Sequence, residues 1–253
     1  MYYKKMKIAI LAAFCCAAFT LSAKEAIVFV GGHPDDSEGF AATAFLLKDK
    51  YDIHIVDLTR GERGLGLEGM YDGSTAAKRV AEEYAACRLL GAKAHFLHEV
   101  NGWACASERS IHSLTELFIK LRPLAVFTHW PVDVHEDHVL TSAVVAKALV
   151  DCRLWDKTQR YFFEVVKSET RNYVPLHYVD VSSTMSNKVE MLRCYACQNK
   201  NDGLVNQKLQ QAKERGAERV PSVEYAETFT TFDGRPIKDG VIESLPETVT
   251  VKR

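Results

Sequence analysis

Two short stretches of the chain concentrate histidine and acidic side chains. One is GGHPDDSE at 31–38, and the other is HWPVDVHEDH at 129–138. An H-x-x-D turn in the first and an H-x-x-H turn in the second contain enough donors to supply a site of two imidazoles and one carboxylate with open positions. Catalytic zinc keeps three protein ligands and a water, and the same donors suit non-haem iron(II), so the residues alone do not fix the metal. The candidate ligands and catalytic groups are His33, Asp35, Asp36, His135, Asp137 and His138.

Each stretch taken alone also has a simpler interpretation. Asp, Pro and Gly are common in turns, and HEDH is compatible with the solvated start of a helix, where the macrodipole favours acidic side chains. The two stretches together, each directly after an expected strand, favour a metal site.

The elements expected around these stretches alternate between apolar strands and helices. Such alternation, with nearly continuous apolar strands, is typical of an α/β fold whose mostly parallel sheet is covered on both faces. In these sheets the site lies beyond the carboxyl ends of the strands, which is where both stretches fall. The expected strands are 25–30, 52–59, 93–99, 124–130, 160–166 and 177–182, and the expected helices are 37–49, 75–91, 107–121, 138–150, 184–199 and 205–218.

Three further segments carry weaker signals. GLGLEGMYDG at 64–73 is glycine-rich, and we expect a flexible loop over the site. Cys194 and Cys197 form C-x-x-C on an expected helix, where packing on one face is favoured over redox or metal chemistry. Residues 220–253 are rich in turn signals, and we expect them to wrap the domain.

Composition limits the classes of protein that the chain can belong to. The 253 residues are 47% hydrophobic, which suits one α/β domain with a sizeable core. A net charge of −1 gives no basic footprint, so binding to nucleic acid is not expected. With no linker in sight, residues 24–253 are predicted to form a single domain.

The first 23 residues have the pattern of a secretory signal peptide. Three lysines precede an apolar run at 8–21, which ends in Ser22 and Ala23. The run is shorter than the ~20 residues of a bilayer span, so cleavage after Ala23 is favoured over retention as an anchor. The predicted mature protein is secreted or periplasmic and has no stable membrane span.

These motifs resemble the LmbE-like, or PIG-L, family of zinc-dependent N-deacetylases. The family's A-H-P-D-D-x-E is present with Gly32 in place of the alanine, and its H-x-D-H is present at 135–138. LTRGERG at 58–64 and RVAEEYAACRLLG at 79–91 resemble the motifs between them, and later blocks follow in order. The resemblance implies a three-layer, Rossmann-like fold with a mostly parallel central sheet.

The resemblance also implies a role for each residue of the two stretches. His33, Asp36 and His138 would bind zinc, and Asp35 would be the general base that takes a proton from water. His135 would stand as a cation that stabilises the oxyanion or protonates the leaving amine. Asp137 would hold His135 in orientation and raise its pKa, although a plain helix N-cap is the alternative for this aspartate.

Substrate contacts are expected from two more positions. Arg79 matches a family arginine that reaches a sugar hydroxyl, with a surface ion pair to Glu82 or Glu83 as the alternative. Asn101 stands where many members have an aspartate, and an amide can still bond a hydroxyl. Trp103 can stack on a sugar, but a buried packing role is favoured.

The function implied is a zinc hydrolase, with Fe²⁺ as the other metal, that removes the acetyl group from an N-acetylated sugar of the N-acetylglucosamine type. An amidase for a larger acyl amide or a thiol conjugate is the enzymatic alternative. A non-catalytic carbohydrate-binding relative is the alternative outside enzymes. The sequence leaves the oligomeric state open.

Overall fold

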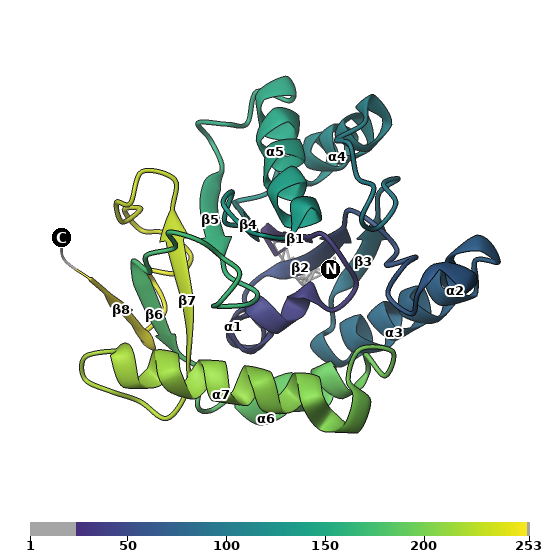
Figure 1. Ribbon diagram of the computed structural model, residues 1–253. Coiled ribbons are helices and arrows are strands. Elements are labelled where there is room, and N and C mark those ends of the chain that lie inside the picture. The colour runs from purple at the N-terminus through teal and green to yellow at the C-terminus, as the bar shows by residue number, and fades with distance from the viewer. Residues whose placement is uncertain (1–23, 252–253) are drawn as a thin grey trace, which may run out of the picture.

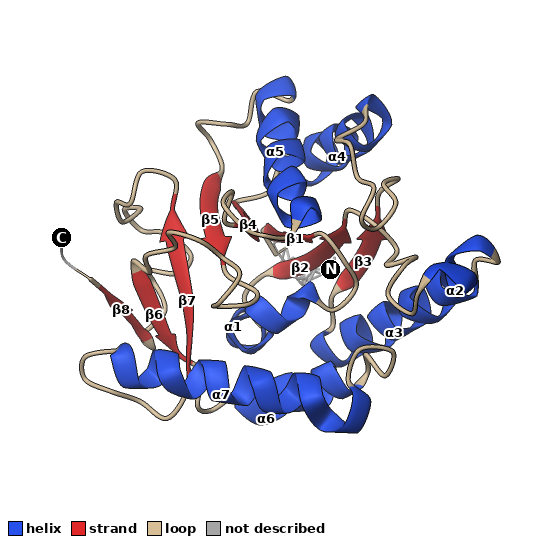
Figure 2. Cartoon of the chain, viewed as in Figure 1, coloured by secondary structure: helices blue, strands red, loops and turns tan. Residues whose placement is uncertain are grey.

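The computed structural model describes residues 24–251, so the predicted signal peptide lies outside the described residues. Within this range eight strands form one sheet between two layers of helices (Figures 1 and 2). None of the helices in this range is long and apolar enough to cross a membrane. The strands are β1 (Ala26–Gly31), β2 (Asp52–Asp57), β3 (Lys93–Phe96), β4 (Ala125–His129), β5 (Gln159–Phe163), β6 (His177–Asp180), β7 (Ala226–Thr231) and β8 (Thr248–Thr250). The helices are α1 (Ala41–Leu47), α2 (Leu67–Tyr71), α3 (Ser74–Leu90), α4 (Glu108–Leu121), α5 (Glu136–Asp151), α6 (Met185–Arg193) and α7 (Gly203–Glu218), with short 3₁₀ turns η1 (Asp36–Gly39) and η2 (Lys200–Asp202).

The strand order is β3-β2-β1-β4-β5-β7-β6-β8. Strand β1 pairs in parallel with β2 on one side and with β4 on the other, and β3 and β5 continue the parallel part. The chain therefore leaves β1 toward β2 and later crosses to the other side of β1, where it forms β4. A parallel sheet has its ligand crevice at such a switch point, outside the carboxyl ends of the two strands.

Alternate residues of β1 face two separate hydrophobic cores. Ile27 and Phe29 pack with residues of α1, α3, α6 and α7, whereas Val28 and Val30 pack with residues of α4 and α5. In Figure 1 these two groups of helices lie on opposite sides of the sheet. The predicted three-layer α/β architecture with a mostly parallel sheet is confirmed, because both faces of the parallel strands are buried.

The C-terminal segment departs from the prediction that it only wraps the domain. Residues 226–231 form β7, which inserts between β5 and β6 and pairs with both in antiparallel fashion. All six residues of β7 are buried although most of them are polar, which is why the segment does not read as a core strand. The antiparallel strands β7, β6 and β8 extend the parallel sheet at this edge.

Two smaller predictions are also corrected. The expected flexible loop at 64–73 contains the short helix α2. Helix α6 ends at Arg193, so Cys194 and Cys197 lie beyond it and do not share a helical face. Neither cysteine is in a disulfide bond.

Candidate metal site

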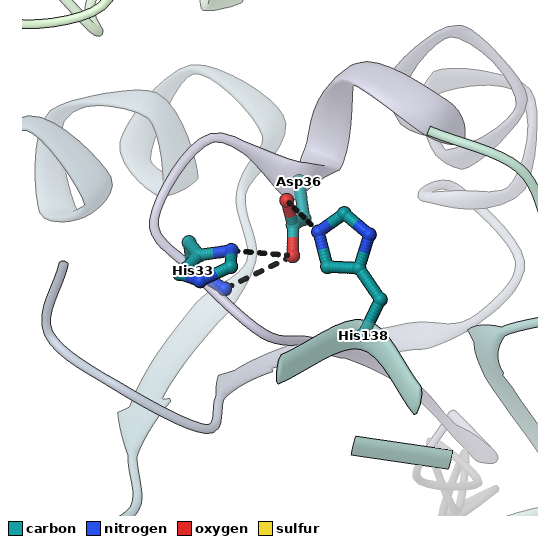
Figure 3. A group of neighbouring side chains, drawn as sticks. All are labelled: His33, Asp36 and His138. Atoms are coloured by element: carbon teal, nitrogen blue, oxygen red, sulfur yellow. Dashed lines mark hydrogen bonds and ion pairs between the residues drawn. The ribbon is translucent and has the colours of Figure 1, made fainter. Parts of the chain in front are cut away.

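The two sequence stretches meet because β1 and β4 are neighbours in the sheet. Val30 pairs with Thr128, so the loops that follow these strands leave the sheet side by side. The ligand atoms of His33, Asp36 and His138 all lie within 4.8 Å of one another, and the three residues are buried. Figure 3 shows the Asp36 carboxylate between the two imidazole rings. The predicted ligand set is therefore assembled at the carboxyl edge of the sheet.

The two oxygens of Asp36 have different surroundings. Oδ2 accepts hydrogen bonds from the backbone N–H of Gly32 (2.6 Å) and of His33 (2.9 Å), and it lies 2.9 Å from His129 Nε2. Oδ1 has no hydrogen bond among residues 24–251 and lies 3.6 Å from His138 Nε2. Although burial alone would raise it, His138, His129 and His33 hold the pKa of Asp36 well below its usual value. Oδ1 is thus the charged oxygen that is left to meet a cation.

The two glycines before His33 permit this arrangement. A Cβ added at Gly31 would lie 2.9 Å from the Asp36 Cβ, which is closer than real Cβ atoms approach. A Cβ at Gly32 would lie 3.3 Å from both Asp36 Oδ2 and His138 Cδ2. Glycine at these positions allows the Asp36 carboxylate to fold back against the end of β1.

A second carboxylate faces one ring nitrogen of each predicted ligand histidine. Asp137 Oδ2 lies 2.9 Å from His33 Nε2, and Asp133 Oδ1 lies 3.3 Å from His138 Nδ1. The remaining ring nitrogen of each histidine then faces Asp36, at 3.6 Å in both cases. Metal-bound histidines characteristically use their other nitrogen in this way.

The charge balance of the cluster also favours a cation. Burial opposes a charge on His33 and His138, yet Asp36 and the orienting carboxylates raise their pKa values to about 9 and about 10. The site thus holds positive charge as protons, which a metal ion would displace on binding. Two imidazoles and one carboxylate suit zinc and iron(II) equally, so the residues present fit the predicted metal.

Asp35 adopts a backbone conformation that is rare for a residue with a side chain. Its φ of 112° and ψ of −17° lie where glycine is favoured, and strain of this kind is often found at functional sites. Its Oδ1 is paired with the guanidinium of Arg79, which also donates to the carbonyl of Pro34. Burial outweighs the attraction of Arg79 and raises the pKa of Asp35 to about 7. A carboxyl group poised near neutrality is suited to general base catalysis.

Arg79 has a different protein partner from the surface ion pair that was the alternative to a sugar contact. It is buried, with 4% of its side chain exposed, and it does not form a surface ion pair with Glu82 or Glu83. Its guanidinium reaches from α3 to Asp35 and lines the cavity beside the metal ligands. Its position fits an arginine that holds Asp35 in place.

Asp137 does not hold His135, which corrects the expectation for this pair. Its Oδ2 contacts His33, the Asn101 side chain (3.2 Å) and the backbone N–H of Gly102 (2.6 Å). The hydrogen bond between the two residues uses the backbone of Asp137 instead of its carboxylate. The Asp137 N–H donates to His135 Nδ1 at 3.3 Å. Burial, His33 and His138 lower the pKa of His135 despite the attraction of Asp137. Since Nδ1 accepts, the neutral ring carries its proton on Nε2 and is a hydrogen-bond donor there.

The region around Asn101 also differs from expectation. The Asn101 amide is used at both ends, because Nδ2 donates to Asp137 and Oδ1 accepts from the backbone N–H of Arg63 at 3.3 Å. Trp103 is 54% exposed, so the prediction of a buried packing tryptophan is wrong. The Arg63 guanidinium lies 5.0 Å above its ring. Positive φ at Gly102 turns the chain there, which leaves the indole outside the core.

A cavity of about 250 Å³ opens over the cluster. This volume is near the lower end of the ~300–1,000 Å³ that is usual for ligand pockets, so the cavity suits a small ligand. All of the candidate ligands and catalytic groups except Asp137 line it. Its walls also include Val165, Val166 and Glu169 from the segment after β5, and Gly64 and Gln198 from two other loops.

Two neighbouring groups were not assigned a role from the sequence. His129 holds Asp36, and Asp133 holds His138. Both belong to the second stretch. The contact between His129 and Asp36 joins the two stretches and forms because β4 lies next to β1. The sequence signal for them is the high density of titratable residues between 129 and 138.

A comparison with protein families finds a match to the PIG-L model, described as GlcNAc-PI de-N-acetylase, over residues 28–149. This segment runs from β1 into α5 and contains both histidine and aspartate stretches. The resemblance drawn from the sequence is confirmed. The assignment of the protein as a hydrolase that acts on amide bonds is confirmed with it.

Solved structures share the fold at low sequence identity. N,N'-diacetylchitobiose deacetylase from Pyrococcus horikoshii has a TM-score of 0.71 and 22% identity, with 83% of this chain and 84% of that chain covered. GalB, the 4-carboxy-2-hydroxymuconate hydratase from Pseudomonas putida KT2440, has a TM-score of 0.73 and 21% identity, with coverage of 85% and 98%. Teicoplanin deacetylase Orf2, in a zinc-inhibited form, has a TM-score of 0.60 and 16% identity, with coverage of 81% and 96%. Proteins with this fold include both deacetylases and a hydratase, so the fold alone does not identify the substrate. The substrate has to be inferred from the residues of the site.

Proposed function

We propose that the protein is a metal-dependent deacetylase of N-acetylated sugars. The proposal starts from the match of residues 28–149 to the PIG-L family model. The protein would release acetate and a free amine from a substrate of the N-acetylglucosamine type. One observation carries the proposal: the ligand atoms of His33, Asp36 and His138 converge beneath a cavity that Asp35 and His135 also line.

The metal would be held by His33, Asp36 and His138. Zinc, when bound, supplies a Lewis acid that lowers the pKa of a coordinated water from 15.7 to about 7. Iron(II) remains the second candidate because it takes the same donors. One of the similar structures is a zinc-inhibited form of teicoplanin deacetylase. Both ions should therefore be tested at a small molar excess over the protein.

The protein groups would divide the remaining work. Asp35 would accept the proton of the attacking water, and the buried Arg79 would keep its carboxylate pointed into the cavity. His135 would donate from Nε2 to the developing oxyanion or to the leaving amine, since its Nδ1 is already an acceptor. Two adjacent aspartates thus serve as metal ligand and as base.

Two of the similar structures support an N-acetylated glycan or glycoconjugate as substrate. Their names describe a deacetylase of N,N'-diacetylchitobiose and one of teicoplanin. The signal-peptide pattern in residues 1–23 supports a secreted or periplasmic location for the proposed enzyme. A substrate in the cell envelope or in external glycans fits that location better than a cytosolic thiol conjugate.

The test is acetate release by the purified protein after removal of metal and reloading with Zn²⁺ or Fe²⁺. We expect turnover of N-acetylglucosamine or N,N'-diacetylchitobiose with one of the ions, and none without metal. Longer N-acyl glucosamines and thiol-conjugated N-acetyl sugars serve as competing substrates. Preference for the longer acyl chains would favour the amidase alternative, and failure to bind any metal would overturn the proposal.

A further inference from the structure

Glu169 differs from the other carboxylates that line the cavity. Asp36 faces three imidazoles, Asp35 is paired with Arg79, and Glu38 lies 2.9 Å from Lys208 Nζ. The half-buried Glu169 side chain lines the same cavity, and among residues 24–251 it has no side-chain hydrogen bond or ion pair. A carboxyl group in a binding cavity that has no partner in the protein is available to a ligand.

The backbone N–H and the backbone carbonyl of Glu169 are both hydrogen-bonded. Its N–H donates to the Val166 carbonyl at 2.9 Å, and its carbonyl accepts from the Val134 N–H at 3.2 Å. The next residue, Thr170, bridges to Asp133 and donates from Oγ1 to Asp133 Oδ2 at 2.8 Å. Because Asp133 also faces His138, this short chain of contacts sets the position of Glu169 relative to the metal ligands.

The other polar groups of the cavity are largely committed to the protein. The Asn101 amide bonds Asp137 and the Arg63 backbone, and Gln198 donates from Nε2 to the Gly64 carbonyl at 3.2 Å. Arg79 is held by Asp35 and by the carbonyl of Pro34. Glu169 is therefore the charged group of the cavity that a substrate meets without displacing a protein contact.

We infer that Glu169 is the residue that selects the sugar class, binding hydroxyl or ammonium groups and rejecting sugars that carry a carboxylate. The inference rests on the proposed deacetylase function. A carboxylate only accepts hydrogen bonds, and its two oxygens suit the adjacent hydroxyls of a sugar ring. A second carboxylate in the same cavity would be repelled, and unfavourable like-charge contacts are a common source of specificity.

The experiment compares two N-acetyl sugars that differ in a single acidic group. Acetate release from N-acetylglucosamine and from N-acetylmuramic acid, which bears a lactyl carboxylate, is measured for the wild type and for Glu169→Gln. The matched control is Glu25→Gln, which replaces the same side chain at an exposed position. Glu25 lies just before the amino end of β1, whereas the cavity lies beyond its carboxyl end. Thermal unfolding of all three proteins verifies that they are folded.

We expect Glu169→Gln to lower the preference for N-acetylglucosamine over N-acetylmuramic acid by about tenfold or more. The loss on N-acetylglucosamine should be mainly in KM, because the contact is present in ground state and transition state alike. Glu169→Asp, which keeps the charge, should retain the preference. Inhibition by the cationic product glucosamine should also weaken in Glu169→Gln and stay unchanged in Glu25→Gln.

An unchanged preference in Glu169→Gln would overturn the inference while leaving the proposed function in place. If the metal-loaded wild type released acetate from neither sugar, the proposed function and the inference would both be overturned.

Discussion

Two groups of buried charges lie close together in the molecule, and they are built differently. We call the group at the cavity, made of His33, Asp36 and His138, the open cluster. The closed cluster consists of three ion pairs, Lys208–Glu38, Lys188–Glu227 and Arg215–Glu164, of which Glu38 also lines the cavity. In the closed cluster each carboxylate lies 2.6–2.9 Å from a permanent cation, whereas Asp36 Oδ1 faces an imidazole at 3.6 Å.

This difference in the partners of the carboxylates indicates a different role for each cluster. A lysine or arginine that pairs with a buried carboxylate neutralises its charge, which weakens the attraction for a metal ion, so we assign the closed cluster a structural role. Lys208 also donates to the carbonyl of Val165 at 2.7 Å, and Val165 is part of the cavity wall. Glu227 bonds the backbone N–H groups of Ala42 and Thr43 (3.1 and 2.7 Å) at the start of α1. The closed cluster thus supports the elements that carry the open one.

The largest effect is expected from removing the charge of Asp36. Asp36→Asn keeps the size of the side chain but replaces the anionic oxygen that faces His138 with a neutral group. We expect loss of bound metal and a fall of deacetylation to background, measured by elemental analysis and acetate release. Retention of both metal and activity would show that the open cluster is not the metal site.

Asp35→Asn should separate catalysis from metal binding. The variant keeps its ligands and should keep its metal, but loss of a general base lowers kcat by about 10²–10⁴-fold. Elemental analysis and steady-state kinetics on the same preparation measure the two properties. If activity survives, Asp35 is not the base, and if the metal is lost, Asp35 contributes to the ligand set.

Arg215→Met tests the closed cluster. The change leaves Glu164 buried without the two 2.6 Å hydrogen bonds that it now receives, so we expect a loss of about 3–5 kcal/mol in the free energy of unfolding. Urea unfolding followed by circular dichroism measures it.

The matched control for that experiment is Lys147→Met, which breaks an exposed pair with Asp151 on α5. Its effect on the free energy of unfolding should stay within about 0.5 kcal/mol. Similar losses in the two variants would mean that the closed cluster is no more important to stability than a surface pair.

The variant Glu99→Gln tests whether hydrogen bonds can stabilise a buried carboxylate in place of a cation. Burial opposes its charge, but Ser107, Ser110 and the N–H of Cys105 bond it and lower its pKa to about 2. A lowered pKa stabilises the folded state above the ordinary pKa of about 4.3, and this contribution is lost as pH falls toward 2. Glu99→Gln should therefore cost about 1–3 kcal/mol at pH 7.

The pH dependence is the distinguishing measurement for this variant. The difference in free energy of unfolding between wild type and Glu99→Gln should shrink between pH 5 and pH 3. A difference that stays constant over this range would mean that shape, rather than charge, accounts for the role of Glu99.

Much of the open cluster could be predicted from the sequence. His33 and Asp36 follow one buried strand, and His138 follows another. In a parallel sheet the carboxyl ends of the strands share one edge, so local strand patterns are enough to bring such groups together. The closed cluster gave no comparable signal, because its lysines, arginine and glutamates lie far apart in the chain and resemble surface charges.

The sequence by itself determined the alternation of strands and helices and the chemistry of the ligand set, since both depend on residue type and short-range spacing. The tertiary structure alone decided which charged groups became partners. It placed Asp137 on His33 rather than on His135, and Arg79 on Asp35. It also inserted the polar strand β7 into the sheet and left Glu169 facing the cavity. These outcomes depend on distances between segments that are remote in the chain, which packing sets and local sequence does not encode.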